Sequence, residues 1–176
     1  MRKHKEQRVG VFVDVQNMYY SAKNLYSTHV NFGKILEDSV SDRKLIRAIA
    51  YVIRADNTEE QKFFDALDNI GYEVRQKDLQ TFISGTKKGD WDVGIAIDAI
   101  TMAPKLDVVV LVTGDGDFVP LVEFLQYNGL LVEVTAFQET ASSRLVQSTD
   151  DFTNLSENVN KYLIKKTLKG SLLKDK

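Results

Sequence analysis

The sequence predicts an α/β protein, a three-layer α/β/α sandwich with a mostly parallel central sheet. Short β-branched runs alternate with segments of helical period along the chain, as in parallel strands joined by helices. The clearest run, LDVVVLVTG at residues 106–114, is apolar without alternation. Such a run is typical of a strand that helices cover on both faces.

Each element of the first half has its own signature. RVGVFVDV at residues 8–15 is a β-branched run that predicts a buried strand, and residues 17–27 and 30–40 have helical period. KLIRAIAYVIR at 44–54 predicts the second strand. Residues 57–71 predict a helix with Asn57 or Thr58 as its N-cap and Gly71 as its stop, and residues 72–82 are strand-like.

The second half continues this alternation. A polar loop at residues 83–91 precedes a predicted helix at 92–103, which Pro104 ends, and the strand at 106–114 follows. Residues 117–129 predict a helix that tolerates Pro120 in its first turn. Residues 130–137 are expected to form the last strand, and the chain from Gln138 onward is expected to be mostly helical.

Length and composition bound the class of protein. A chain of 176 residues is the size of one compact domain that buries roughly 70% of its unfolded surface. Cysteine is absent, which excludes disulfides and thiolate metal sites and fits a reducing compartment. No apolar run approaches the roughly 20 residues of a membrane span. We therefore expect a cytoplasmic protein.

Basic residues gather at the two ends of the chain. The net charge is −2, but the first eight residues carry four basic residues and one acid, and the last sixteen carry six and one. We divide the chain into a basic extension at 1–8, one domain at 9–156 and a basic helix or tail at 157–176. The tails are either solvated or hold phosphates. An apolar stripe of Ile164, Leu168 and Leu172 either packs on the domain, makes a homodimer contact or lies along RNA.

Acidic residues follow two of the predicted strands. Asp14 ends the first strand, and Asp115 and Asp117 flank Gly116 just after the strand at 106–114. Ligand sites in open α/β sheets form at this edge, so these acids converge if the two strands are neighbours. Asp92, at the start of a helix, is a fourth candidate. Crowded carboxylates repel unless a cation neutralises them, and oxygen ligands suit Mg²⁺ or Mn²⁺.

Structural roles are open for several of these residues and their neighbours. Asp115 or Asp117 would also cap the next helix, Asp90 would cap the helix at 92–103, and Asn17 either caps the first helix or contacts a carboxylate or substrate. Asp98 lies on another helix face than Asp92 and is expected either to support the metal ligands from outside the site or to be an ion-pair partner. Lys88 is either solvated or a phosphate contact. Three rings either pack on a helix or stack on bases, those of Tyr19, Tyr20 and Tyr26.

Four blocks, in this order, resemble one family. VFVDVQNMY, KKGDWDVGIAIDA, VVLVTGDGDFVPLVEFLQYNG and SSRLVQSTDDFTNL are similar to the pattern of NYN domains of the LabA-like (DUF88) group, relatives of PIN-domain nucleases. The resemblance spans residues 9 to about 156. It implies a PIN-like fold, an acidic pocket that binds Mg²⁺ or Mn²⁺ and, in active members, metal-dependent cleavage of RNA.

The resemblance also implies roles by position. Asp14 and Asn17 match the first block, Asp92 the second, and Asp115 and Asp117 the third. The last block contains Arg144, Asp151 and Phe152, for which structural, rim and catalytic roles are all open. The family more commonly has a serine in the third block, where this chain has Thr113 and Gly116; this difference leaves the carboxylates intact and alters a hydroxyl contact to phosphate.

The sequence therefore predicts a Mg²⁺- or Mn²⁺-dependent ribonuclease that hydrolyses single-stranded RNA. The predicted metal ligands and catalytic residues are Asp14, Asp92, Asp115 and Asp117, and the predicted substrate contacts are Asn17, Lys88 and Thr113. The alternative is a regulatory protein that keeps the acidic site and binds nucleic acid or a protein without cleavage. A phosphatase of the haloacid dehalogenase kind fits less well, because such enzymes usually have an acid where this chain has Gln16.

Overall fold

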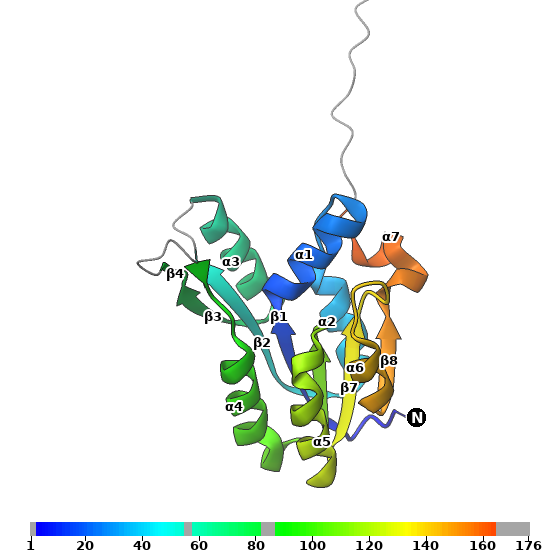
Figure 1. Ribbon diagram of the computed structural model, residues 1–176. Coiled ribbons are helices and arrows are strands. Elements are labelled where there is room, and N and C mark those ends of the chain that lie inside the picture. The colour runs from blue at the N-terminus through cyan, green and yellow to red at the C-terminus, as the bar shows by residue number, and fades with distance from the viewer. Residues whose placement is uncertain (1–2, 55–57, 82–86, 165–176) are drawn as a thin grey trace, which may run out of the picture.

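A computed structural model describes residues 3–54, 58–81 and 87–164 of the chain. Within these residues one sheet has six parallel strands in the order β3-β2-β1-β6-β7-β8. The strands are β1 (Arg8–Asp14), β2 (Lys44–Arg54), β3 (Glu73–Asp78), β6 (Val108–Val112), β7 (Leu131–Ala136) and β8 (Asp151–Asn154). Figure 1 shows helices on both faces of this sheet. The predicted α/β/α sandwich is confirmed.

The helices form two layers, one on each face of the sheet. The first layer contains α1 (Val15–Tyr26), α2 (Phe32–Val40), α3 (Thr58–Ile70) and α7 (Val159–Tyr162). The second contains α4 (Asp92–Met102), α5 (Val119–Tyr127) and α6 (Ser143–Ser148). Three short 3₁₀ turns connect elements: η1 (Ala103–Lys105), η2 (Gly116–Phe118) and η3 (Leu155–Asn158).

The central strand β6 explains why its sequence is apolar without alternation. Its five side chains, VVVLV, are all fully buried. Val108, Val110 and Val112 pack into the core beneath the first helix layer, and Val109 and Leu111 pack into the core beneath the second. Successive side chains of a strand point to opposite faces, so a strand between two helix layers needs apolar residues at every position.

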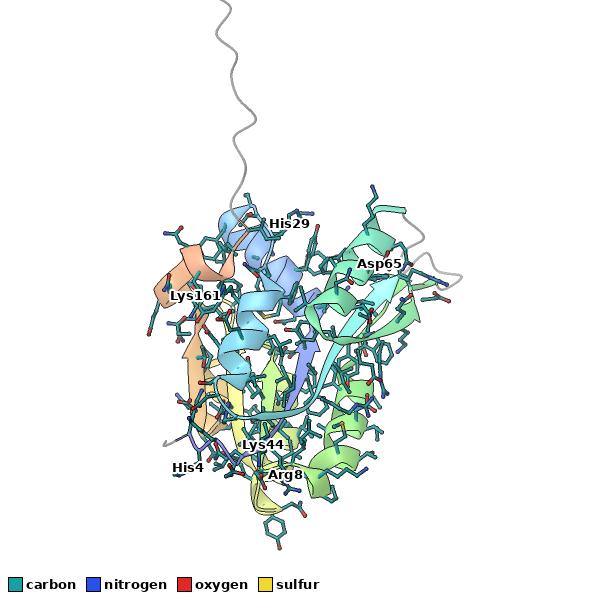
Figure 2. The ribbon with its side chains drawn as sticks, turned by 180° about the vertical axis from the view of Figure 1, so that it is seen from behind. His4, Arg8, His29, Lys44, Asp65 and Lys161 are labelled. Atoms are coloured by element: carbon teal, nitrogen blue, oxygen red, sulfur yellow. The ribbon has the colours of Figure 1, made fainter. Side chains whose placement is uncertain are left out.

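The strand order reverses between β1 and β6. The chain runs outward from β1 through β2 to β3, then returns to place β6 on the other side of β1 and continues to β7 and β8. Figure 2 shows Arg8 and Lys44, the first residues of β1 and β2, at one end of the molecule and His29 at the opposite end. The carboxyl ends of β1 and β6 therefore meet at one edge, which is where such folds bind ligands.

Two parts of the sequence prediction are corrected. Residues 130–137 do not hold the last strand, because β8 pairs in parallel with β7 in a region that was expected to be mostly helical. A strand of four half-buried residues is too short to display a period of two. The polar loop at 83–91 is also partly wrong: β5 (Lys87–Lys88) pairs with β4 (Gln80–Thr81) in a small antiparallel ladder.

The end of α3 matches its predicted stop signal. Gly71 has φ +114°, its N–H donates to the Asp68 carbonyl, and the Tyr72 N–H donates to the Leu67 carbonyl, a pattern that terminates helices at glycine. The candidate cap Asn57 lies outside the described part of the chain, as do Leu168 and Leu172, and Thr58 is the first residue of α3. Ile164 is described and lies beyond α7 with an exposed side chain.

No helix among the described residues is both long enough and apolar enough to cross a membrane.

A buried ion pair links the two halves of the sheet. Arg43, just before β2, donates to both carboxylate oxygens of Glu133 on β7, at 2.7 and 2.9 Å, and also to the Ser39 carbonyl. The two side chains are almost fully buried. Because a buried charge that loses its partner is costly, this pair constrains how β2 and β7 sit relative to each other.

The variant Arg43→Met leaves the Glu133 carboxylate buried without this partner. We expect the free energy of unfolding, measured by urea denaturation at pH 7, to fall by about 3 kcal/mol. The matched control Lys34→Met removes the partner of Glu37 in an exposed pair within α2 and should lower the free energy of unfolding far less, because exposed ion pairs contribute little to stability. Equal losses in the two variants would contradict this account of the fold.

Candidate metal centre

Four acidic residues lie at the edge where the strand order reverses. Asp14 is the last residue of β1, and β1 pairs in parallel with β6 through Val13 and Val112. Asp115 and Asp117 follow β6 within a short loop and η2. Asp92 is the first residue of α4, which packs against β1. Because β1 and β6 are neighbours, the acids that follow these two strands converge as the sequence predicted.

Three of these acids form a tight cluster. A carboxylate oxygen from each of Asp92, Asp115 and Asp117 lies within 4.8 Å of the other two. Asp92 and Asp115 are half-buried, and Asp117 is exposed. All donors are carboxylate oxygens, which are ligands that hard divalent cations such as Mg²⁺ and Mn²⁺ prefer. The cluster therefore fits a divalent cation.

Asp14 stands beside this cluster rather than within it. It lines a pocket of about 390 Å³ together with Asp92 and Asp115. Burial is the main cause that raises the pKa of Asp14 to about 6, and the charges of Asp92 and Asp115 act in the same direction. Its ionised form is thus costly in the protein without a cation. Three of the four predicted ligands therefore form the cluster, and the fourth, Asp14, is half-buried next to it.

Hydrogen bonds fix Asp14 to the loop that follows β6. The Asn17 backbone N–H donates to Oδ1 of Asp14 at 3.1 Å, so Asp14, not Asn17, is the N-cap of α1. The Thr113 hydroxyl lies 3.4 Å from Oδ2 of Asp14 and accepts the Asp115 N–H at 3.2 Å. Thr113 is fully buried, so its hydroxyl contacts carboxyl and backbone groups beneath the surface, a position that does not support the expected contact with substrate.

The Asn17 side chain holds the same loop from the other side. Its Oδ1 accepts the Gly114 N–H at 2.9 Å, so the side chain does not cap the helix. Asn17 also lines the acidic pocket, and its contact to a metal-bound carboxylate or to substrate stays a prediction. Gly114 also approaches the backbone of Thr140 and Ala141 so closely that a Cβ would lie 3.0 Å from it. The loop is therefore clamped between α1 and the segment after β7.

Asp115 caps the 3₁₀ turn that presents Asp117. Its Oδ1 accepts the Asp117 N–H at 2.9 Å, which makes Asp115 the N-cap of η2. Asp117 lies inside that turn and does not cap it. One carboxylate oxygen of Asp115 is thus engaged with the backbone, and the side chain has a defined orientation toward the pocket that it lines.

The side chain of Asp98 connects α4 to strands β2 and β3. Asp98 accepts the Tyr51 hydroxyl at 2.7 Å and pairs with Arg75 at 2.8 Å, so the expected role as an ion-pair partner is confirmed. Asp90 does not cap α4, whose N-cap position is held by Trp91 without a side-chain hydrogen bond.

Trp91 is a pocket residue that the sequence reasoning missed. Its ring lies 5.3 Å from that of Tyr51, and its indole N–H donates to the Val52 carbonyl at 2.9 Å. The Lys77 ammonium lies 5.6 Å from the Trp91 ring centre. The sequence offered one signal for this role, because the single tryptophan of the chain directly precedes the predicted ligand Asp92.

The remaining predicted residues lie away from the cluster or outside the description. Asp151 begins β8 beside Glu133, three strands away from β1 and Asp14, and pairs with Lys3 at 3.9 Å. Phe152 packs against the core beneath the second helix layer, and Arg144 is exposed on α6. For Asp151 and Phe152 the structural alternative is therefore the one observed. The side chain of Lys88 lies outside what the structure describes.

Comparison with known proteins agrees with this architecture. The NYN domain family matches residues 8–157 of the chain. The Low amplitude and bright protein LabA of Synechococcus elongatus is 27% identical over 158 residues, which cover 85% of this chain and 84% of that protein. The crystal structure of a Vibrio parahaemolyticus protein of unknown function superposes with a TM-score of 0.84 at 32% identity, covering 93% of this chain and 100% of that one.

The family match spans most of the chain, and the fold and the ordered acidic blocks are those that the PIN-like resemblance implied. The chain belongs to the NYN domain family.

Proposed function

We propose that this protein is a metal-dependent ribonuclease that hydrolyses phosphodiester bonds in single-stranded RNA. The observation that carries the proposal is the cluster of Asp92, Asp115 and Asp117, whose carboxylate oxygens lie within 4.8 Å of one another at the carboxyl edge of the sheet. Membership in the NYN domain family supports nucleic acid as the substrate class. The preference for RNA over DNA rests on that family membership alone.

Each residue of the site has a role in the proposal. Asp92, Asp115 and Asp117, with Asp14 beside them, would hold Mg²⁺ or Mn²⁺. A bound divalent cation supplies activation of water for attack on phosphorus and stabilisation of the developing negative charge. Thr113 and Asn17 keep the loop of Asp115 in place through their hydrogen bonds. Lys88, and Lys77 beside Trp91, are proposed to attract the substrate phosphates.

A binding protein without nuclease activity is the second candidate. The position of Asp14 favours it, because this carboxyl is half-buried, hydrogen-bonded within the protein and outside the cluster of three. Such a site would keep enough carboxylates for a cation while lacking one that catalysis needs. The two candidates differ in turnover, which the next experiment measures.

The variant Asp115→Asn tests the proposed activity. Asn retains the oxygen that accepts the Asp117 N–H but removes one negative charge from the cluster. We expect cleavage of a labelled single-stranded RNA in Mn²⁺ to fall by about 10²-fold or more, while the melting temperature in EDTA stays near that of the wild type.

The matched control for this experiment is Asp42→Asn, which removes an exposed carboxylate away from the cluster and should cleave as the wild type does. Cleavage that persists in Asp115→Asn would point to a contaminating nuclease. A wild-type protein that binds the RNA but never cleaves it would favour the binding protein.

The raised pKa of Asp14 predicts how stability depends on pH. The pKa of this carboxyl changes from its ordinary value of 3.8 to about 6 on folding, so the folded protein binds more protons than the unfolded chain between these values. The free energy of unfolding in EDTA should therefore fall as pH rises from about 4 to about 6. This contribution is present at low pH and lost at neutral pH.

The variant Asp14→Asn lacks this titration. We expect it to be more stable than the wild type in EDTA at pH 7, by up to about 3 kcal/mol, and to lack the wild-type loss of stability between about pH 4 and pH 6. Chemical denaturation across this range measures both effects, with Asp42→Asn as the control. A variant less stable than the wild type at pH 7 would contradict the assigned cost of ionising Asp14.

A further inference from the structure

A second hollow adjoins the acidic pocket. It has a volume of about 690 Å³ and lies between α1 and α3, near the carboxyl end of β2. Figure 1 shows these two helices flanking that end of the sheet. Gln16 and Tyr20 line both this hollow and the acidic pocket. The two spaces are therefore neighbours on either side of these two residues at the start of α1.

The polar side of this hollow carries several rings and a cation. We call it the aromatic groove and define it by Gln16, Tyr19, Tyr20, Lys23, His29 and Phe63. Tyr20 is 51% exposed, although its ring contacts that of Tyr19 edge-on at 5.5 Å. The ring of His29 lies 5.9 Å from that of Tyr19, and Figure 2 shows His29 at the end of the molecule opposite Arg8.

We propose that the aromatic groove binds unstacked bases of a single-stranded nucleic acid whose neighbouring phosphate lies at the acidic pocket. This inference rests on the proposed function, and it places the nucleic acid next to the scissile phosphate in the aromatic groove. Aromatic side chains bind bases of any sequence because every base has a π-face. Tyr20 is the residue between the two spaces, so it meets the base next to the phosphate.

Charge and size favour this occupant over an apolar peptide. The groove adjoins the acidic pocket, and two residues that line this pocket, Asp92 and Asp115, belong to a carboxylate cluster suited to a cation that would bind phosphate. The Lys23 ammonium lies 5.6 Å from the Tyr19 ring centre, where it offers a charge to the nucleic acid backbone. A volume of 690 Å³ is within the range of about 300–1,000 Å³ that compact ligands fill, the size of about one or two nucleotides.

The geometry also accounts for a preference for single strands. Bases in a duplex are stacked and paired, so they present their edges and not their faces to a protein. Aromatic side chains in the groove can therefore stack only on bases of a strand that is unpaired and unstacked. The carboxylates select for phosphate through a cation, and the aromatic groove selects for unpaired bases.

The affinity for a labelled phosphorothioate oligouridylate of about eight nucleotides tests the proposal by fluorescence anisotropy. Binding is measured in Mn²⁺ and in EDTA, so that the groove is tested with and without the metal site. We expect Tyr20→Ala to weaken binding by about 5-fold or more under both conditions. Tyr20→Phe keeps the ring and should bind as the wild type does, as should Tyr127→Ala, which removes a 91% exposed ring on α5.

An abasic version of the same oligonucleotide isolates the contribution of base stacking. It keeps the phosphates and lacks the bases, so wild type and Tyr20→Ala should bind it equally. A loss that persists on the abasic probe would assign Tyr20 to the backbone or to folding and would overturn the proposal. Wild-type affinity in Tyr20→Ala would overturn it too, and so would a rise in affinity, which would indicate that another occupant competes for the groove.

This outcome is separable from that of the proposed function. If Tyr20→Ala binds the oligonucleotide as the wild type does while metal-dependent cleavage is intact, the proposed role of the groove is rejected and the proposed nuclease activity stands. Tyr20-dependent binding to bases in EDTA, without cleavage in Mn²⁺, would support the groove and reject the nuclease.

Discussion

The site depends on one constraint, that β1 and β6 are parallel neighbours at the point where strand order reverses. Residues that follow the carboxyl ends of these strands have to share one edge, although they are far apart in the sequence. Carboxyl groups placed there are close and partly buried, and the raised pKa of Asp14 expresses the cost of that placement. A divalent cation bound at these carboxylates would remove that cost.

Hydrogen bonds turn this crowding into a defined arrangement. Asn17 on α1 holds the Gly114 N–H, and buried Thr113 connects Asp14 with the Asp115 backbone. Asp115 in turn orders the turn that carries Asp117. The loop after β6 is thereby tied to β1 through polar groups, while the strands beneath it are held by apolar packing on both faces. Stability and site geometry thus come from different parts of the fold.

The sequence predicted the sheet and the place of the acids well, because both follow from local patterns. A run such as VVVLV is typical of a strand buried on both faces, and an acid such as Asp14 at the end of another apolar strand indicates the edge where ligands bind, although its role as the N-cap of α1 was not predicted. What the sequence could not predict is set by contacts between distant segments. The edge strand β8 is too short for a pattern, the partner of Asn17 lies on another loop, and the groove beside Tyr20 exists only once α3 packs next to α1.

The central claim is that the cluster of Asp92, Asp115 and Asp117 binds a divalent cation. The most direct test is a crystal structure of the protein grown with Mn²⁺, with diffraction measured at a wavelength where manganese scatters anomalously. The account predicts an anomalous peak within about 2.0–2.6 Å of carboxylate oxygens from this cluster. A well-ordered pocket with no such peak, or carboxylates turned instead toward lysine or arginine side chains, would contradict it.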